Sequence, residues 1–375
     1  MNNPMNIMNN SYLHVDLGTL RENLETILSS LPAECSIIPV LKDDAYGLGL
    51  ERVAAVLEEY DRVSLAAVAH VSEGLILRGA GFKKDILVMG SPLPFQLEAA
   101  ILSGLTMALG SMEAFSMINA SAAALGLKAK VHIKVDTGLH RIGFEPGAEL
   151  DALCRELAGC GNIEVTGAFS HFSNAENGDS CKEQYGLFLS AVESIERAGI
   201  SVPMRHICCS AASELYPQYA LDAVRLGRRL YMDKPTDGDG IVKELASWRG
   251  YITAVKARKA GESIGYGGKC VLEKDCLIAT LGVGYGDGLQ GALCDIHAPV
   301  LIKGQRCRLM ACCMDQSFAD VTGLDCKPGD EVCFFGYDSA GNFLSSQEVA
   351  LLIGGDEGCG LTSAISTRVA RVYSE

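Results

Sequence analysis

The chain has 375 residues, of which 48% are hydrophobic and 21% are charged. This length exceeds one ordinary domain of about 100–200 residues, and the composition is that of a globular protein, not of a disordered one. Lys and Arg number 32 against 46 Asp and Glu, a net charge of −14. Nucleic acid and anionic membranes need a basic surface. Neither is therefore expected as a main partner, whereas a small anion could still bind in a locally positive pocket.

Targeting signals and paired cysteines are both absent from the sequence pattern. No uncharged stretch reaches the roughly 18 apolar residues of a membrane-spanning helix. Residues 1–10 are rich in Asn and Met and lack the basic start and apolar core of a signal peptide. The 15 cysteines are an odd number without a C-x-x-C pair. We expect a soluble, cytoplasmic protein with reduced thiols.

Residues 36–226 repeat one unit, a short β-branched run followed by a turn and an amphipathic segment. Apolar residues recur at helical spacing in 50–60, 111–126 and 183–199. Strands that alternate with helices indicate a parallel sheet, and eight units favour a closed (β/α)8 TIM-type barrel over an open doubly wound sheet. The expected strands are 36–41, 63–68, 85–89, 105–109, 129–135, 164–169, 205–208 and 221–226.

The pattern changes after Ser247. Apolar runs at 276–283, 299–304 and 331–336 are separated by Gly, Pro and Asp turns, with few helical patterns between them. Short apolar runs separated by turn residues are typical of a mostly β domain. We therefore expect a barrel domain over 11–245 and a C-terminal β domain over 246–375.

Nucleotide and metal motifs do not account for the chain. The Gly-rich segments 265–268 and 282–288 fit neither G-x-G-x-x-G nor G-x-x-x-x-G-K-[ST]. There is no H-E-x-x-H or G-x-S-x-G, and the seven His are too scattered for a metal cluster. Turns between β strands explain the Gly-rich segments better, and no metal is expected.

Polar residues follow several of the expected barrel strands, where barrel enzymes collect their functional groups. The residues at these ends are Lys42, Lys134, Asp136, Arg141, His171, Ser210 and Arg225. Lys42 follows an apolar strand, and desolvation of a lysine lowers its pKa and makes it a better nucleophile toward a carbonyl. From Lys42 alone, a rim lysine with its head in water is the simpler interpretation.

Nine segments, taken in order, resemble the alanine racemase family. The segment PVLKDDAYGLG (39–49) is similar to the family's pyridoxal-phosphate lysine segment. The others are KVDTGLHRIGF, SHFSNAE, HICCSAASELYP, VRLGRRLY, GESIGYGG, VGYGDG, ACCMDQSFADV and STRVARVY. They run from near residue 36 to the C-terminus, and the resemblance implies the same fold, a barrel followed by a β domain.

The resemblance implies a set of residues that bind pyridoxal 5′-phosphate. Lys42 would form the Schiff base, Arg225 would face the pyridine nitrogen with His206 bracing it, and His171 would lie beside the ring. The implied phosphate-binding positions are Tyr46, Ser210, Gly227 and the backbone of Arg228. A guanidinium cannot accept a proton, so the ring nitrogen stays unprotonated and the electron sink is weakened. Quick reprotonation at Cα is then favoured over transamination.

Racemisation needs a base on each face of Cα, and the resemblance implies Lys42 for one face and Tyr266 for the other. From the residues alone, Tyr266 reads as a turn aromatic between strands. In the family this tyrosine comes from the second subunit, together with Met314 and Asp315, which implies a homodimer with shared sites. The substrate side would also include Tyr285, Arg141, and Lys134, which resembles a lysine that is carbamylated to hold that arginine.

Four departures from the family gather on the substrate side. Thr367 stands where a tyrosine is usual, Ala311 and Gly291 replace arginines, and Cys209 occupies a position that is commonly Asn. Smaller residues at the pocket wall should admit a side chain larger than methyl, and Thr367 could hydrogen-bond a hydroxyl. Such a pocket discriminates by only about 1–3 kcal/mol. Serine is therefore expected as a second substrate.

The leading hypothesis is a pyridoxal-phosphate racemase of alanine, or of alanine and serine, that supplies D-amino acids for peptidoglycan. One alternative is an amino-acid decarboxylase of the same fold. Such enzymes set an acid against the ring nitrogen, so Arg225 counts against this alternative. The other is a non-catalytic pyridoxal-phosphate-binding regulatory protein, in which Tyr266 would have no purpose.

Overall fold

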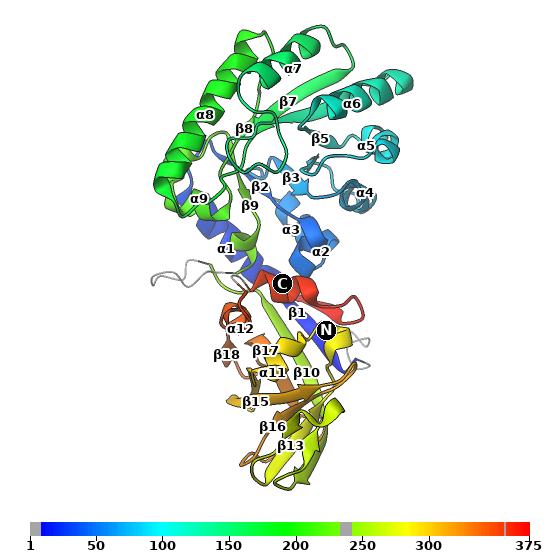
Figure 1. Ribbon diagram of the computed structural model, residues 1–375, viewed down its shortest axis with the longest axis vertical. Coiled ribbons are helices and arrows are strands. Elements are labelled where there is room, and N and C mark those ends of the chain that lie inside the picture. Colours follow the sequence, from blue (N-terminus) through cyan, green and yellow to red (C-terminus); the bar gives the residue numbers. More distant parts are fainter. Residues whose placement is uncertain (1–8, 233–241, 356–357) are drawn as a thin grey trace. The chain divides into compact units, whose positions relative to one another are not determined.

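The computed structural model describes residues 9–232, 242–355 and 358–375. The chain forms two compact units that interleave along the sequence (Figure 1). The barrel unit comprises 24–45 and 50–230, and the β unit comprises 1–23, 46–49 and 231–375.

The barrel unit is built on eight parallel strands. A six-stranded sheet runs in sequence order from β3 to β8, and β2 pairs with β9. Isolated bridges Ile37–Val63 and Val40–Ala67 join β2 to the β3 segment, and the N–H of Arg225 donates to the carbonyl of Cys208 beyond β8 (3.0 Å). The strands are β2 (Ser36–Pro39), β3 (Leu65–Val68), β4 (Asp85–Val88), β5 (Thr106–Leu109), β6 (Ala129–Lys134), β7 (Ile163–Phe169), β8 (Arg205–His206) and β9 (Ala223–Leu226). The barrel expected from the sequence is confirmed, with a strand at each expected position.

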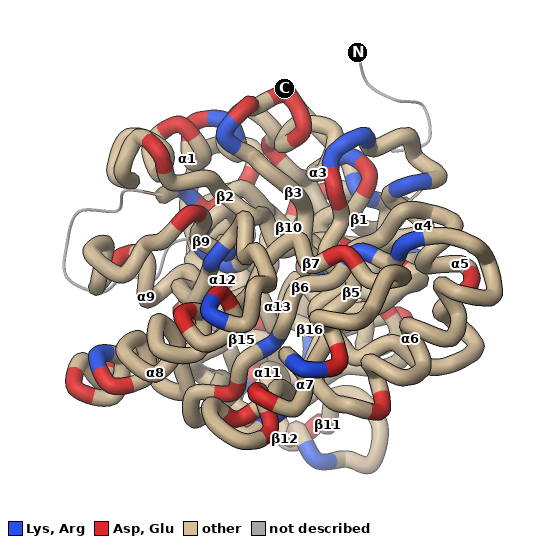
Figure 2. Tube along the Cα trace, turned by 90° about the horizontal axis from the view of Figure 1, so that it is seen from above, with Lys and Arg blue, Asp and Glu red and all other residues tan. Residues whose placement is uncertain are grey.

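Helices alternate with these strands as the apolar periodicity predicts. On α3, the buried residues include Leu50, Val53 and Leu57, which recur at helical spacing and form one stripe. Helix α8 carries both basic and acidic residues (Figure 2). The helices are α1 (Leu17–Ser30), α2 (Lys42–Gly47), α3 (Leu50–Glu58), α4 (Val71–Gly79), α5 (Leu97–Leu102), α6 (Met112–Leu125), α7 (Ala148–Ala158), α8 (Gly178–Arg197), α9 (Ser210–Leu215) and α10 (Arg228–Tyr231). Over the described ranges, no helix is both long and apolar enough to cross a bilayer.

The β unit is a nine-stranded sheet in the order β18-β17-β14-β15-β16-β13-β10-β1-β19. Its longest strand, β10 (Ala246–Arg258), pairs antiparallel with β1, β13 and β17. The other strands are β1 (Ser11–Asp16), β11 (Ser263–Ile264), β12 (Cys270–Val271), β13 (Cys276–Leu281), β14 (Pro299–Ile302), β15 (Gln305–Cys312), β16 (Ser317–Asp320), β17 (Glu331–Tyr337), β18 (Phe343–Leu344) and β19 (Ala370–Ser374). Its helices are α11 (Gly291–Asp295), α12 (Ser346–Leu352) and α13 (Cys359–Ala364).

Strand β1 is absent from the sequence-based expectation, which proposes no strand before residue 36. Its burial alternates, with Leu13 and Val15 fully buried. It pairs antiparallel with β10 and parallel with β19, so the first and last strands lie side by side in the β unit. The alternation is only six residues long and leads directly into a helix, which hides it from a search for repeated strand–helix units.

All 15 cysteines are free thiols, as the odd count and spacing predict. Several are core residues. Burial raises the pKa of Cys208 to about 12, and burial does the same for Cys333. A thiol with so high a pKa is a weak nucleophile at neutral pH. These two residues therefore fill the interior and carry no reaction.

Candidate active site

Functional side chains gather at one end of the barrel because the carboxyl ends of parallel strands meet there. Lys42 begins α2, three residues after β2 ends, Lys134 ends β6, His171 follows β7, His206 ends β8, and Arg225 lies in β9. The positive charges of Lys42, Lys134 and Arg225 all act on His171. Lys42 is exposed, which agrees with the interpretation of a rim lysine rather than that of a desolvated one.

Lys42 begins a turn of left-handed helix. Residues 43–46 all have positive φ, between 53° and 58°, and Gly47 follows at 80°. Left-handed backbone costs L-residues about 1–2 kcal/mol each, or about 4–8 kcal/mol for four of them. Such strain persists only where the surrounding structure holds it in place. In the barrel unit, the N–H of Ala45 donates to the Leu41 carbonyl (3.0 Å) and the N–H of Leu50 to the Asp44 carboxylate (2.8 Å).

The second half of this turn packs within the β unit. A Cβ on Gly47 would lie 2.2 Å from the carbonyl oxygen of Thr362 in α13, so only glycine fits. Arg371 donates from Nε to the Gly47 carbonyl (2.9 Å), and the Tyr373 hydroxyl donates to the Leu48 carbonyl (3.1 Å). The C-terminal segment therefore fixes the turn that carries Tyr46.

Arg225 is the centre of a buried network in the barrel unit. Its Nη1 donates to His206 Nδ1 (2.7 Å) and to the His206 carbonyl (3.1 Å). Its Nη2 donates to His171 Nδ1 (2.9 Å) and to the carbonyls of Ser170 and Ile207 (2.7 and 2.9 Å). Burial lowers the pKa of Arg225 to about 10, so it remains a cation at neutral pH. Among the described residues, its Nε has no hydrogen-bond partner.

The tautomers of the neighbouring histidines follow from Arg225. A guanidinium only donates, so Nδ1 of His206 accepts and its proton sits on Nε2. That N–H points at Nδ1 of His132, 2.9 Å away, which must also be unprotonated. Burial, followed by the charge of Arg225, holds the pKa of His206 well below its usual value. Burial likewise lowers the pKa of His132 to about 3. Both rings are neutral and their orientation is fixed.

Phe169 lies between two cations on the same face of the barrel strands. Lys134, Phe169 and His206 are register neighbours across β6, β7 and β8. The Phe169 ring stacks on His206 with centroids 5.1 Å apart. Lys134 Nζ lies 5.4 Å from its centroid and Arg225 Cζ 5.6 Å. An aromatic face attracts cations at this range, which helps to keep both charges in the interior.

Lys134 is 1% exposed. Its Nζ donates to the carbonyl of Val135 (2.7 Å). Burial, then the positive charge of Arg225, lowers the pKa of Lys134 to about 7. A substantial fraction of this amine is therefore uncharged at neutral pH.

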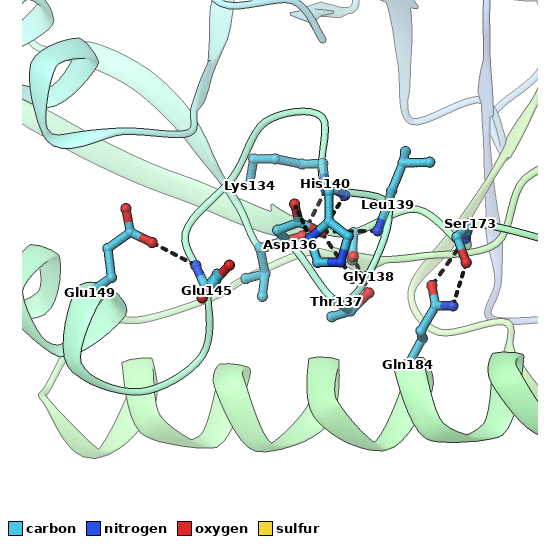
Figure 3. A network of polar contacts seen from close by, with 12 residues as sticks. Lys134, Asp136, Thr137, Gly138, Leu139, His140, Glu145, Glu149, Ser173 and Gln184 are labelled. Atoms are coloured by element: carbon cyan, nitrogen blue, oxygen red, sulfur yellow. Dashed lines mark hydrogen bonds and ion pairs between the residues drawn. The ribbon is translucent and has the colours of Figure 1, made fainter.

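The loop after β6 carries Arg141 and is organised by Asp136 (Figure 3). One carboxylate oxygen of Asp136 accepts from the N–H groups of Gly138, Leu139 and His140 at 2.9–3.1 Å. Burial alone would raise the pKa of Asp136, but the Gly138 and His140 donors outweigh it and the pKa lies below its ordinary value. The carboxylate thus fixes the loop, while Arg141 at its far end is exposed.

The expected phosphate-binding positions Ser210 and Gly227 meet at the ends of β8 and β9. The Gly227 N–H donates to the Ser210 hydroxyl (3.1 Å). Ser210 begins α9, and the buried Arg228 begins α10 directly after Gly227. Tyr46 lies in the β unit, with its ring 5.5 Å from that of the buried Tyr231. Across the described ranges, no group of three or more His, Cys, Asp or Glu could hold a metal ion.

In the β unit, the structure joins Tyr285, Met314 and Asp315. The N–H groups of Tyr285 and Gly286 donate to the carbonyls of Cys313 and Met314 (3.0 and 2.8 Å). Arg368 bridges the two segments, since Nε donates to buried Asp287 (2.6 Å) and Nη2 to Asp315 (2.7 Å). Three of the expected substrate-side residues therefore lie on two segments that hydrogen bonds join within the β unit.

Two further expected residues stand apart on the β unit. Tyr266 lies in a turn with 80% of its surface exposed. Thr367 is also exposed, next to Arg368. Lys42 belongs to the barrel unit and Tyr266 to the β unit.

Several residues that contact the expected site residues were not expected from the sequence. They are His132, Phe169 and Glu73 in the barrel unit, and Asp287, Arg368 and Arg371 in the β unit. His132 had a usable signal. It precedes Lys134 by two residues in VHIKV, and polar residues at strand period share one face of a strand whose other face is apolar. The arginines gave no such signal, because their partners lie far away in sequence.

Comparison with known proteins gives a consistent result over the whole chain. The family profile "Alanine racemase, N-terminal domain" matches residues 15–235, and "Alanine racemase, C-terminal domain" matches 245–373. The alanine racemase of Desulfovibrio desulfuricans is 33% identical over 97% of this chain and 98% of its own length. That of Symbiobacterium thermophilum is 35% identical over 98% and 97%.

Solved structures agree with the sequence comparisons. An alanine racemase from Clostridium difficile 630 superposes with a TM-score of 0.91 at 32% identity, over 98% of this chain and 96% of that one. The Bacillus anthracis enzyme with bound L-Ala-P gives 0.90 at 26% identity, over 98% and 95%. Since both family profiles match and the relatives align from end to end, the chain belongs to the alanine racemase family, and it is an isomerase.

Proposed function

We propose that this protein interconverts L- and D-alanine with the help of pyridoxal 5′-phosphate. The observation that carries the proposal is Arg225. Five contacts hold its two terminal nitrogens, while Nε has no partner among the described residues. An N–H donor held this rigidly suits a pyridine nitrogen that accepts but is not protonated. The remaining donor set also fits, because the Lys42 amine and the Ser210–Gly227 pair lie on strand ends of the same barrel.

Each residue has a proposed role toward the cofactor. Lys42 would hold its aldehyde carbon, and Ser210, Gly227, the Arg228 backbone and Tyr46 its phosphate. His206 would keep Arg225 in place, with His171 beside the ring. Pyridoxal phosphate, when bound, supplies the electron sink that makes the substrate Cα–H acidic. The remaining work, which is binding, orientation and proton transfer, falls to the protein.

Proton transfer is proposed to use two bases. The Lys42 amine would take or return the Cα proton on one face, and the Tyr266 phenol would do so on the other. A phenol has an ordinary pKa near 10, so it needs positive neighbours to work as a base at neutral pH. Tyr266 is 80% exposed in the single chain. We therefore propose a homodimer in which Tyr266, with Met314, Asp315 and Tyr285, completes the partner's site.

Lys134 is proposed to act through Arg141. Only an uncharged amine adds CO₂, and a pKa of about 7 provides that form at neutral pH. Addition of CO₂ releases one proton and leaves an anionic carbamate, which could hold the Arg141 guanidinium near the substrate carboxylate. A carbamate resonance in wild-type protein supplied with ¹³C-bicarbonate, absent from Lys134→Arg, would support this role.

Serine is proposed as a second substrate because Thr367 is smaller than the tyrosine usual at this position in the family, and a smaller side chain there would leave room for a hydroxymethyl group. The test compares kcat/KM for L-alanine and L-serine before and after Thr367→Tyr. The change should shift preference toward alanine by about tenfold, since pocket contacts of this kind differ by about 1–3 kcal/mol. An unchanged ratio would remove Thr367 from the substrate pocket.

The biological role follows from the chemistry. Solved relatives are described as complexes with cycloserine and with L-Ala-P, both small molecules. We propose that the product D-alanine, with D-serine, supplies peptidoglycan synthesis in the cytoplasm.

The primary test is Lys42→Ala. Wild-type protein should carry a visible absorption band from lysine-bound cofactor and should racemise alanine. Lys42→Ala should lose both. Racemisation that survives in Lys42→Ala would refute the assignment, and release of CO₂ from an amino acid would favour the decarboxylase alternative.

A further inference from the structure

Glu73 contacts the turn that carries Lys42, although it lies 31 positions later in the chain. It sits in the first turn of α4, the helix that follows β3. Its Oε1 accepts from the N–H of Asp43 at 2.6 Å. Its Oε2 accepts from the N–H groups of Ala69 (2.8 Å) and His70 (3.0 Å). One carboxylate thus joins the ends of two adjacent strands, β2 and β3.

The Asp43 N–H is a donor that the turn itself cannot satisfy. The first N–H groups of any helical turn lack an acceptor within the turn. The N–H of Ala45 donates to Leu41 as the turn's own bond, whereas Asp43 precedes that bond. A bond from a backbone N–H to a carboxylate is stronger than one to a neutral acceptor.

The hydrogen bond between Asp43 and Glu73 matters because the backbone of the turn is strained. Residues 43–46 all have positive φ, which their side chains disfavour, so the relaxed backbone would run differently after Lys42. The Asp43 peptide is bonded directly to Lys42. A shift of this peptide would therefore move the lysine amine relative to the barrel end.

The geometry points to Glu73 as a positioning residue, which clamps the first peptide of the left-handed turn and thereby sets where the Lys42 amine lies. The inference rests on the proposed function in one respect only, namely that the group bound by the Lys42 amine is pyridoxal phosphate. Glu73 itself touches no reacting atom. It acts through the backbone of Asp43.

The competing explanation is that Glu73 only caps α4, through Ala69 and His70. Glu149 offers a matched control, because it also lies in the first turn of a helix (α7) and accepts from a loop N–H, that of Glu145 (2.8 Å; Figure 3). Glu149→Ala removes the same kind of bond from another loop. Glu73→Gln retains one acceptor oxygen and should rescue in part.

The first experiment needs neither cofactor nor activity. Amide hydrogen exchange is followed by mass spectrometry in cofactor-free wild type, Glu73→Ala, Glu73→Gln and Glu149→Ala. Glu73→Ala should speed exchange in a peptide covering residues 42–50 by about tenfold, the loss expected for one charge-assisted hydrogen bond. Glu149→Ala should leave this peptide unchanged. Faster exchange in α4 alone, with 42–50 as in wild type, would overturn the inference in favour of a simple cap.

The second experiment measures the consequence for Lys42. Affinity for pyridoxal phosphate, followed by the visible band, should fall about tenfold in Glu73→Ala and less in Glu73→Gln. With alanine, kcat should fall while KM changes little, because the substrate contacts are intact. Unchanged affinity together with unchanged kcat would contradict the role. If wild type binds no cofactor, the proposed function fails, and the exchange experiment still decides whether Glu73 clamps the turn.

Discussion

Arg225, His206 and His132 are joined in series by hydrogen bonds, and Arg225 determines the tautomers of both histidines. Arg225 can only donate, so each histidine is locked into one tautomer, and burial keeps both neutral. Gly167 makes room for this arrangement, since a Cβ there would lie 2.8 Å from the His132 ring. The last acceptor, His132, therefore supports the orientation of Arg225 from two residues away.

Removing the His132 acceptor should destabilise the protein. His132→Leu leaves the buried Nε2–H of His206 without a partner, which costs about 1–3 kcal/mol. His132→Asn places an amide oxygen near the original Nδ1 and should retain much of the stability. Urea unfolding of the three proteins measures the difference, and ¹⁵N spectra of His206 report its tautomer. Equal stability of the His132→Leu and His132→Asn variants would contradict the role of His132 as the hydrogen-bond acceptor for His206.

Lys134 should make stability depend on pH in an unusual direction. Its folded pKa of about 7 lies below its ordinary value of 10.5, so the unfolded state binds the proton more tightly. The charged form opposes folding fully below about pH 7, and this opposition is lifted as pH rises toward 10.5. Lys134→Met should therefore stabilise the protein more at pH 6 than at pH 9, measured by urea unfolding in CO₂-free buffer. A stabilisation that is equal at both pH values would show that Lys134 is not desolvated.

The turn Lys42–Gly47 is the element on which the site depends most. Its residues carry backbone strain, and both halves are held by groups distant in sequence, namely Glu73 for the first half and Arg371 and Tyr373 for the second. At Gly47 the backbone approaches α13 so closely that an added Cβ would lie 2.2 Å from the carbonyl oxygen of Thr362. A local change there should reach Lys42 through the backbone.

Gly47→Ala tests this dependence, with Gly81→Ala as its control. Both glycines have positive φ (80° and 94°), but a Cβ at Gly81 meets nothing within 4 Å. Gly81→Ala should cost about 1 kcal/mol from backbone conformation alone. Gly47→Ala should cost clearly more and should also weaken cofactor binding, because Thr362 must move. Thermal unfolding and cofactor titration measure both effects, and equal behaviour of the two variants would be contrary to this packing.

Regular elements could be predicted from the sequence because their signals are local. β-branched runs marked all eight barrel strands, and apolar spacing marked helices such as α3 and α8. The left-handed turn could not be predicted, since KDDAYG contains no glycine until its end, and Asp adopts positive φ only at single positions and not as part of a run of four. Bridges such as Arg368 to Asp287 and Asp315 were equally hidden, because 81 and 53 positions separate the partners. Local sequence patterns therefore identified the polar residues at the strand ends, but not the distant residues that hold them in place.

The molecule as a whole divides the proposed chemistry between its two units. The barrel unit carries Lys42 and the buried Arg225 network, while the β unit presents exposed Tyr266, Tyr285 and Met314 at 80%, 50% and 53%. A monomer would leave these side chains in water. A second copy of the chain that covers them would bury these side chains and would gain the second base from them.

Mixed dimers test whether sites are shared between subunits. Lys42→Ala and Tyr266→Phe should each abolish racemisation alone, because each removes one of the two proposed bases. In a heterodimer of the two variants, a shared arrangement builds one intact site and one doubly defective site. Purified heterodimers carrying two different tags should therefore recover about half of the wild-type activity. No recovery, with dimers demonstrably formed, would show that each chain uses its own two residues.

The central claim, racemisation of alanine that depends on Lys42, is tested most directly by one exchange measurement. Wild-type protein with pyridoxal phosphate is incubated with L-alanine in deuterium oxide, and the enantiomers are separated and analysed by mass. The account predicts D-alanine that carries deuterium at Cα, with the rate lost in Lys42→Ala. Bound cofactor without exchange or inversion at Cα would contradict it and would favour the non-catalytic alternative.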